Sequence, residues 1–456
     1  MTLKKSKNLG TVDLIHGPIM KSLIVFMIPI LISNAFQQLY NAVDTAIVGN
    51  YLGETSLAAI GACSSVFEMI VSFAMSLGTG FSLVAARAYG SQDHDRIRRT
   101  VAASIVIGLL TSLVITLISI FGLKPLLQLI NTPADILMES YAYIRIIGTW
   151  IIVMFAYNLC AAMLRAIGNS VVPLVFLVFS SLLNIFLDIF CITTLHMGVA
   201  GAAAATVVSQ AVSAVLCILY MVLKTKILIP TKEDFRFDKE IYGDVAGQGF
   251  AMALMGSIVS IGSIILQSGI NSLGEMIIAG HVAGRKIYAI CNLPFMSMAF
   301  AVSTFISQNK GADNGPRILE GIRKSVLYQV IMAAAMTVFL LLSARTMVHW
   351  ISGSTNPVIL NNGSKLLYIV GPFYAVLGIL ITIRMALQGI GAKLIPVISS
   401  VIECIGKILF TALLIPRFGY NAVVWCEPLI WCAMCLQLLW SWYHNPYVRQ
   451  IRHAAV

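Results

Sequence analysis

Leu52-Gly53-Glu54 occurs again as Leu273-Gly274-Glu275, about half the chain length further on. Three more pairs follow in the same order and at the same or nearly the same offset: Gly90-Ser91 with Gly311-Ala312, Gly198 with Gly419, and Ile167-Gly168 with Ile390-Gly391. Because each pair holds the same place relative to the apolar runs around it, the pattern indicates a duplicated unit rather than chance. We therefore expect the two halves of the chain to fold alike.

The composition places this unit in a membrane. Of 456 residues, 59% are hydrophobic and only 11% are charged, and the mean hydropathy is +0.89. Soluble domains are roughly half apolar and about one quarter charged, so this chain is far too apolar and too poor in charge for that class. The sequence predicts a protein whose solvent is a lipid bilayer.

Apolar stretches long enough to cross a bilayer, about 20 residues each, occur twelve times. They cover residues 22–48, 56–87, 100–123, 136–164, 172–194, 199–223, 245–271, 277–307, 325–344, 358–388, 394–415 and 420–443. Six fall in each half, and because six is an even number, both halves enter the membrane from the same side. The predicted fold is an all-α membrane protein of twelve transmembrane helices in two pseudo-symmetric six-helix lobes, arranged as parallel repeats.

Lysine and arginine give the expected orientation. Twenty-one of them lie in the two tails and in the loops on the side of the tails, whereas the opposite loops hold only Lys124, Arg345, Lys365 and Arg417. Positive residues collect on the cytoplasmic side, so both termini are predicted to be cytoplasmic in a multi-pass protein of the cell membrane. The predicted organisation is a tail (1–21), an N-terminal lobe (22–223), a cytoplasmic connector (224–244), a C-terminal lobe (245–443) and a second tail (444–456).

Several functions are disfavoured. The net charge of +11 follows the loop charges, so it gives no reason to expect nucleic-acid binding. The nine cysteines all lie in apolar spans, and Cys432 and Cys435 have no histidine or acid near them, so neither a disulfide framework nor a metal site is expected. Motifs for phosphate loops, zinc proteases and serine hydrolases are absent from the sequence. We expect no enzyme, no cofactor and no direct hydrolysis of ATP.

Asp44 is the first ionisable group within the predicted spans. It ends a stripe on the first span that also contains Pro29, Ser33, Gln37 and Tyr40, at steps of three or four residues that place them on one helix face. A carboxylate in hydrocarbon costs several kcal/mol, so such a face is expected to line the protein interior or a watery path. Pro29 is a candidate conformational residue, because a proline localises bending in a helix.

A second carboxylate reaches a similar depth from another span. At about 1.5 Å per residue, Asp188 on the fifth span lies level with Asp44, with Asn184 one turn away on the same face. Thr206 descends from the outer end of the sixth span toward the same level. Each amide or hydroxyl alone is typical of contacts between membrane helices, but two carboxylates at one depth predict an ionisable site.

The C-terminal half carries both signs of charge within its spans. Its acids are Glu403 and Glu427, and its bases are Arg285, Lys286, Arg384 and Lys407. Glu403 and Lys407 lie one helical turn apart and are expected to neutralise each other. Glu427, like Glu68 in the first half, has no evident partner in the sequence.

Several segments resemble one family of transporters. The run PILISNAFQQLYNAVDTAIVGNYLGETSLAAIG from Pro29, the Arg87-x-Tyr89-Gly90-Ser91 exit of the second span, LRAIGNS (164–170) and NIFLDIF (184–190) are similar to segments of the multidrug and toxic compound extrusion (MATE) family. In its DinF-like branch, the resemblance implies a cation site formed by Asp44, Asn184, Asp188 and Thr206. The acids of the NorM-like branch are missing, because residues 248–272 and 366–392 contain none.

The resemblance and the residues together predict a secondary active transporter. We expect it to export small amphipathic organic molecules in exchange for H⁺ or Na⁺ by alternating access, with H⁺ favoured. Asp44 would be the carboxylate that titrates, and Asp188 and Asn184 would be the partners that tune its titration. Thr206 would supply an oxygen ligand to the cation. The substrate would face Gln37, Tyr40, Asn158 and Asn184. Beyond substrate, coupling ion and lipid no partner is expected, and the chain would act as a monomer.

Two alternatives are weighed against this function. A flippase or exporter of lipid-linked or anionic metabolites would suit the basic C-terminal half. A membrane-embedded enzyme is disfavoured by the missing motifs.

Overall fold

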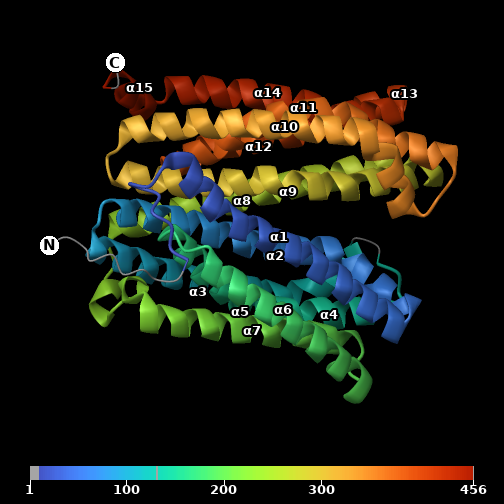
Figure 1. Cartoon of the computed structure of the whole chain (residues 1–456). Helices are drawn as coiled ribbons and strands as arrows, with labels where there is room; N and C mark the ends of the chain where they lie inside the picture. Colours follow the sequence, from blue (N-terminus) through green and yellow to red (C-terminus); the bar gives the residue numbers. More distant parts are fainter. Residues whose placement is uncertain (1–9, 130–131, 455–456) are drawn as a thin grey trace. The chain divides into compact units, whose positions relative to one another are not determined.

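The computed structural model describes residues 10–129 and 132–454. The predicted tails lie partly outside this range, residues 1–9 of the first and residues 455–456 of the second. Within the described residues, eleven helices are long and apolar enough to cross a membrane, and a bent pair of helices would make the twelfth. The prediction of an all-helical protein with up to twelve spans is confirmed (Figure 1).

Each predicted span corresponds to one helix or one interrupted helix. In the first half these are α1 (Ile19–Leu52), α2 (Glu54–Gly90), α3 (His94–Leu129), α4 (Leu137–Thr149) with α5 (Ile151–Ala166), α6 (Val171–Ile189) with the π-helical η1 (Phe190–Thr194), and α7 (Val199–Lys224). In the second half they are α8 (Lys239–Asn271), α9 (Glu275–Gly311), α10 (Gly315–Ser352), α11 (Pro357–Gly389), α12 (Leu394–Leu409) with the π-helical η4 (Phe410–Leu414) and α13 (Ile415–Phe418), and α14 (Tyr420–His444). A last short helix, α15 (Pro446–His453), follows.

The repeat seen in the sequence recurs in the backbone. Gly53 and Gly274 precede α2 and α9 with φ of 85° and 96°, and Gly198 and Gly419 precede α7 and α14 with φ of 60° and 56°. These positive φ values suit glycine, which has no Cβ to clash, and explain why glycine recurs at these places. The π-helical segments η1 and η4 also take corresponding places in the two halves, each directly after the helix of the fifth span of its half.

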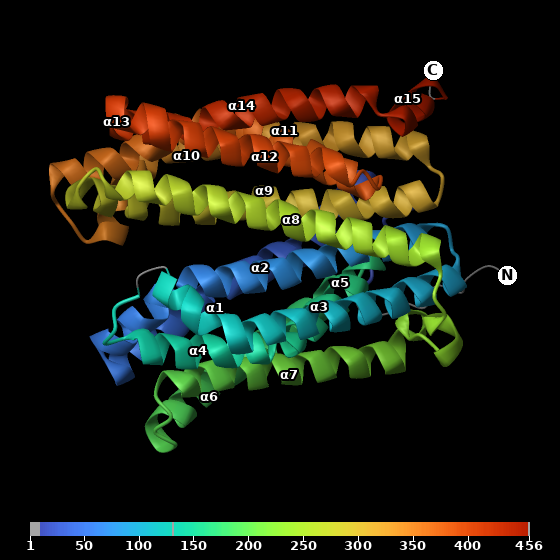
Figure 2. The same ribbon diagram turned by 180° about the vertical axis from the view of Figure 1, so that it is seen from behind.

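The helices pack into two compact units. Among the described residues, unit 1 comprises 10–13 and 28–253, and unit 2 comprises 14–27 and 254–454. Within unit 1, α6 lies against α7, and α5 against α2 and α7; within unit 2, α9 and α10 pack on α11, and α12 on α14 (Figure 2). The predicted lobes 22–223 and 245–443 were drawn from the repeat and the spans, and their boundaries remain a prediction.

Glycines let α9 and α11 approach closely in unit 2. A Cβ at Gly280 would lie 2.6 Å from the carbonyl oxygen of Ile359, and one at Gly363 would lie 2.7 Å from that of Gly280. A Cβ at Gly284 would lie 2.9 Å from the carbonyl oxygen of Gly363. Small residues at such spacing bring membrane helices into backbone contact. Lipid tails are as apolar as the side chains, so van der Waals packing rather than the hydrophobic effect stabilises the association of the helices. This contact fixes α9, which carries Arg285, against α11.

The fourth span is bent, which the sequence did not predict. α4 and α5 meet at Trp150 with an angle of 49°. The hydroxyl of Thr116 on α3 lies 3.2 Å from the carbonyl oxygen of Thr149 and donates to it. A side chain that satisfies a carbonyl freed at the break makes such a bend tolerable in lipid.

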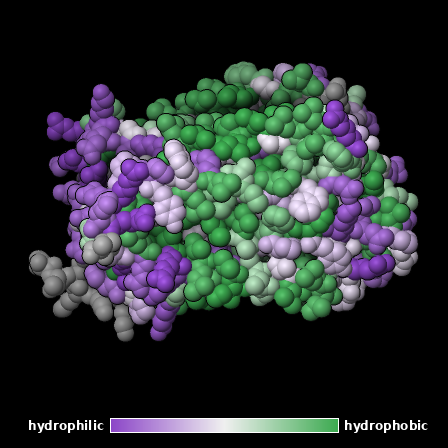
Figure 3. Space-filling model, turned by 90° about the horizontal axis from the view of Figure 1, so that it is seen from above, coloured by the Kyte–Doolittle hydropathy of each residue, from purple (hydrophilic) through white to green (hydrophobic). Residues whose placement is uncertain are grey.

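Hydrophobic side chains cover the middle of the helices. On the face shown in Figure 3, hydrophobic residues gather over the central parts and hydrophilic residues over the ends. Exposed leucine, isoleucine, valine and phenylalanine side chains are numerous along α3, α7 and α10. Such surfaces would be an aggregation hazard in water but match the hydrocarbon core of a bilayer.

The connector is held against unit 1 by ion pairs. Arg87 lies 2.9 Å from Asp244, Arg96 2.9 Å from Glu240, and Arg98 3.2 Å from Asp234. Burial raises the pKa of Asp234, but hydrogen bonds from Thr231 and the charge of Arg98 outweigh it, so the pKa of this carboxyl lies below its usual range.

Candidate cation site and the polar cluster of unit 2

Four predicted residues meet inside unit 1. Asp44 comes from α1, Asn184 and Asp188 from α6, and Thr206 from α7. Asn184 and Asp188 are fully buried, Thr206 is 4% exposed, and Asp44 is half-buried. The carboxyl groups of Asp44 and Asp188 lie within hydrogen-bonding reach of each other. Two ionised carboxylates can only accept and would repel each other, so a shared proton or a bound cation would stabilise this contact.

Asn184 links the carboxylates to α7. With its amide nitrogen turned toward the carboxylate, it donates to Asp188 Oδ2 at 2.8 Å, and its oxygen accepts from the backbone N–H of Thr206 at 3.2 Å. The opposite orientation would place two oxygens against each other, so the network decides the assignment. Asn184 therefore fixes Asp188 in position.

Tyr40 and Thr206 form the next layer. The Thr206 hydroxyl donates to the carbonyl oxygen of Ala202 at 3.1 Å. Because its only proton is used there, it accepts from the Tyr40 hydroxyl, 3.3 Å away. Tyr143 on α4, which the sequence analysis missed, also lies within electrostatic reach of Asp44 and Asp188. No spacing signal relates α4 to these acids, so only the fold reveals this tyrosine.

Two oxygens of the site remain without partners. Asp44 Oδ1 and Asp188 Oδ1 are buried and have no hydrogen-bond partner among the described residues. Buried polar atoms are nearly always satisfied. These two oxygens, with the neutral oxygens of Asn184 and Thr206, are suited to a proton or a small hard cation. In the described part of the chain no cluster of three or more histidine, cysteine or acidic residues could hold a metal ion.

The other predicted residues lie outside this cluster. Gln37 on α1 and Asn158 on α5 are half-buried, and neither makes a hydrogen bond to the cluster within the described residues. The Asn158 amide instead donates to the carbonyl oxygen of Met154 at 2.8 Å. Pro29 is buried within α1, and the Ser33 hydroxyl donates to its carbonyl oxygen at 2.8 Å. The roles proposed for these residues stay predictions.

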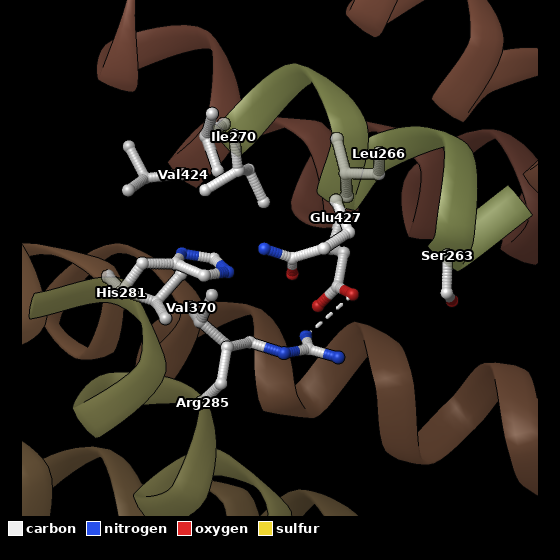
Figure 4. A pocket seen from close by; sticks show the side chains of 11 residues that line it. Ser263, Leu266, Ile270, His281, Arg285, Val370, Val424 and Glu427 are labelled. Carbon is white, nitrogen blue, oxygen red and sulfur yellow. Dashed lines mark hydrogen bonds and ion pairs between the residues drawn. The ribbon is translucent and has the colours of Figure 1, made fainter. Parts of the chain in front are cut away.

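Unit 2 contains a second polar cluster. Lys407 on α12 lies 2.8 Å from Glu403 and donates to the Ser263 hydroxyl at 3.0 Å, as expected for a neutralising pair. Glu427 on α14 pairs with Arg285 on α9 at 2.7 Å (Figure 4). The sequence analysis found no partner for Glu427, because the pair is separated by 142 residues. The available signal was that opposite charges within the spans of one half must find each other.

Among the described residues, up to twelve helices are long and apolar enough to cross a membrane, which defines the class of multi-pass helical membrane proteins. The MatE family profile matches residues 29–190 and 251–413, one segment in each half. The chain therefore belongs to the MatE family, the MATE multidrug efflux transporters, which are not enzymes.

Individual relatives agree with this assignment. The chain is 31% identical to the probable multidrug resistance protein YpnP of Bacillus subtilis over 310 residues, 67% of this chain and 68% of the relative. It is 22% identical to the multidrug export protein MepA of Staphylococcus aureus over 435 residues, 93% of this chain and 94% of the relative.

Solved structures share the fold. A crystal structure of MATE in the bent conformation matches with a TM-score of 0.88 and 23% identity, covering 97% of this chain and 98% of that one. A second match is a MOP superfamily transporter from Pyrococcus furiosus, with a TM-score of 0.86 and 23% identity, covering 98% of this chain and 99% of that one. Its structure is described as having a binding pocket of reverse polarity.

Proposed function

We propose that this chain is a secondary active transporter that exports amphipathic organic molecules in exchange for a cation by alternating access. The observation that carries this proposal is the buried Asp44–Asp188 pair, in which each carboxyl group keeps one oxygen without a partner among the described residues. Ion and substrate would favour different conformations, and their binding would be coupled reciprocally. The names of YpnP and MepA support drug-like substrates.

We assign the chain to the DinF-like branch. The four positions of its cation site carry the expected residues, Asp44, Asn184, Asp188 and Thr206. The regions that hold acids in the NorM-like branch lie within α8 and α11 and contain none. The cation site therefore belongs to the first half of the chain.

A proton is the coupling ion that this geometry favours. Carboxyl groups in contact form a hydrogen bond when one of them carries a proton, and the pair then titrates as a unit. Sodium is the competing ion for the same cage, with backbone carbonyls or water completing its shell. In this scheme Asp44 exchanges the proton, Asp188 and Asn184 tune it, and Tyr40, Gln37 and Asn158 face the substrate.

Reconstitution in liposomes tests the exchange. An imposed pH gradient in sodium-free buffer is expected to drive accumulation of a cationic amphipathic dye, and a sodium gradient at equal pH is expected to drive none. The reverse pattern would refute proton coupling. Failure of both gradients to drive any dye, cationic or anionic, would refute secondary transport.

The orientation is a further proposal, with both termini in the cytoplasm. In a variant lacking the nine cysteines, single cysteines at Thr55 and Ser354 are expected to react with an impermeant maleimide added to whole cells. Cysteines at Gln92 and Thr231 are expected to react only after the membrane is opened. The opposite labelling pattern would show that the termini lie outside.

A further inference from the structure

Unit 2 contains a small cavity that the cation site does not use. Its volume is about 80 Å³, and α8, α9, α11 and α14 line it. Its walls are mixed: Leu266, Val370 and Val424 are apolar, whereas His281, Arg285 and Glu427, with Ser263 and Gln267, are polar or charged (Figure 4). Sites for drug-sized ligands measure roughly 300–1,000 Å³, so this cavity is large enough only for a polar group of a ligand.

Arg285 is held in position, but most of its N–H donors have no acceptor among the described residues. Its Nη1 donates to Glu427 at 2.7 Å, and its guanidinium lies 4.6 Å from the ring centroid of Tyr288. That ring stacks against Tyr374 and Trp431, which makes a rigid support. A guanidinium has five N–H donors, and the described residues offer Arg285 no acceptor besides Glu427. Its side chain is 38% exposed, against 13% for Glu427.

The charges of the polar cluster in unit 2 do not balance, although only Arg285 and Glu427 of its charged residues line the cavity. Glu427 interacts electrostatically with Arg285 and with Lys407. Glu403 forms an ion pair with Lys407 and interacts electrostatically with Arg384. These five linked residues carry three positive and two negative charges. Arg384 is 8% exposed and bonds to the Ser400 hydroxyl, and its Nε has no partner in the part of the chain that the structure describes. Buried charges are expected to be paired, so this cluster lacks one anion.

The position of the cavity within the repeat points to a ligand. Glu427 lies eight residues after Gly419, as Thr206 of the cation site lies eight residues after Gly198. Both glycines precede the corresponding helix with positive φ. One residue of each site thus occupies an equivalent place in the repeat: Thr206 lies beside two acids, and Glu427 lies beside Arg285.

We propose that the cavity at Arg285 binds the oxyanion group, a carboxylate or phosphate, of an anionic amphiphile. Arg285 anchors the group and Glu427 competes with it. The apolar part of the ligand stays outside the cavity, because the volume admits only the acidic group. This inference rests on the proposed export function and adds acids to its substrate classes.

Binding to the purified full chain in phosphatidylcholine nanodiscs tests the site. The probes are pyrenebutanoate and its neutral methyl ester, with empty nanodiscs as background. Wild type is expected to bind the acid more tightly than the ester. Arg285→Gln should weaken acid binding about tenfold or more, as expected for a lost charged hydrogen bond, and leave the ester unchanged.

Two variants separate this effect from misfolding. Lys286→Gln removes an exposed charge from the next residue of the same helix and should leave acid binding unchanged. Glu427→Gln removes the competitor and should tighten acid binding, whereas a purely structural ion pair would make it weaker or neutral. Equal binding of acid and ester by wild type, equal effects of Arg285→Gln and Lys286→Gln, or no tightening by Glu427→Gln would overturn the proposal.

The source of the oxyanion is resolved in the same assay. If phosphatidylglycerol in the nanodiscs competes with the probe, the natural occupant is a lipid phosphate; if it does not, the occupant is a soluble acid. The assay uses no gradient and measures binding alone, so it does not depend on exchange of the coupling ion. If the acid does not bind in this assay, the proposed site at Arg285 is wrong, but the proposed ion exchange is not contradicted.

Discussion

Asp44→Asn is expected to abolish export driven by an ion gradient while the protein still folds and binds its substrate. Asparagine has nearly the shape of aspartate and can still hydrogen bond to Asp188, but it cannot release or accept the coupling proton. Without an exchangeable proton the gradient cannot drive export, so the driven accumulation should fall to the level of liposomes without protein. Dye accumulation in proteoliposomes measures it, with dye binding to detergent-solubilised protein measured beside it.

Glu68→Gln is the matched control for Asp44→Asn. Glu68 is also an acid within a span of unit 1, but it is exposed on α2, so its removal should leave driven export nearly unchanged. Full activity of Asp44→Asn would remove the proposed site altogether. Equal losses in both variants would show that export depends on the charge of unit 1 in general and not on the Asp44–Asp188 pair.

Local periodicity was enough to predict that four polar side chains lie at one depth. The rise and turn of a helix are nearly constant, so counting residues from the ends of three spans placed Asp44, Asp188, Asn184 and Thr206 at one depth. The structure brings these four together, although helix packing was not known. Their functional roles are not tested by this geometry and stay proposals.

Contacts between helices that are far apart in the chain could not be predicted from the sequence. Arg285 and Glu427 lie 142 residues apart, and Tyr143 reaches the cation site only because α4 packs against α2 and α7. At the break at Trp150, Thr116 of a neighbouring helix donates to the carbonyl oxygen of Thr149. Each of these features is a property of tertiary packing, which hydrophobic periodicity alone does not specify.

The duplicated backbone carries two different sets of charges. At the offset that relates Gly53 to Gly274, Asp44 corresponds to Ile265 and Asp188 to Leu409. The second half thus repeats the turns and the helices of the first but not its acids. Caps and turns are needed for each six-helix unit to fold, whereas ionisable groups in lipid persist only where they have a use or a partner. The repeat therefore predicts the fold of both halves and the site of only one.

Loss of either partner of the Glu403–Lys407 pair is expected to destabilise the protein strongly. Lys407 is 3% exposed and Glu403 12%, so Glu403→Gln or Lys407→Met leaves a buried charge without its partner. Such losses cost about 3–5 kcal/mol, whereas replacing both charges is often nearly neutral. Melting temperatures in one detergent should fall clearly for each single variant and recover in the double variant Glu403→Gln/Lys407→Met.

The exposed pair Glu320–Lys324 is the matched control, with the same spacing and a distance of 2.6 Å. Both side chains of this pair are about half exposed, so Glu320→Gln should leave the melting temperature nearly unchanged. A double variant of Glu403 and Lys407 that is no more stable than the single variants would contradict a neutralising pair. If Glu403→Gln instead folds normally but does not transport, and Lys407→Met fails to restore export, Glu403 acts in transport itself, because removal of its partner's charge would otherwise relieve the defect.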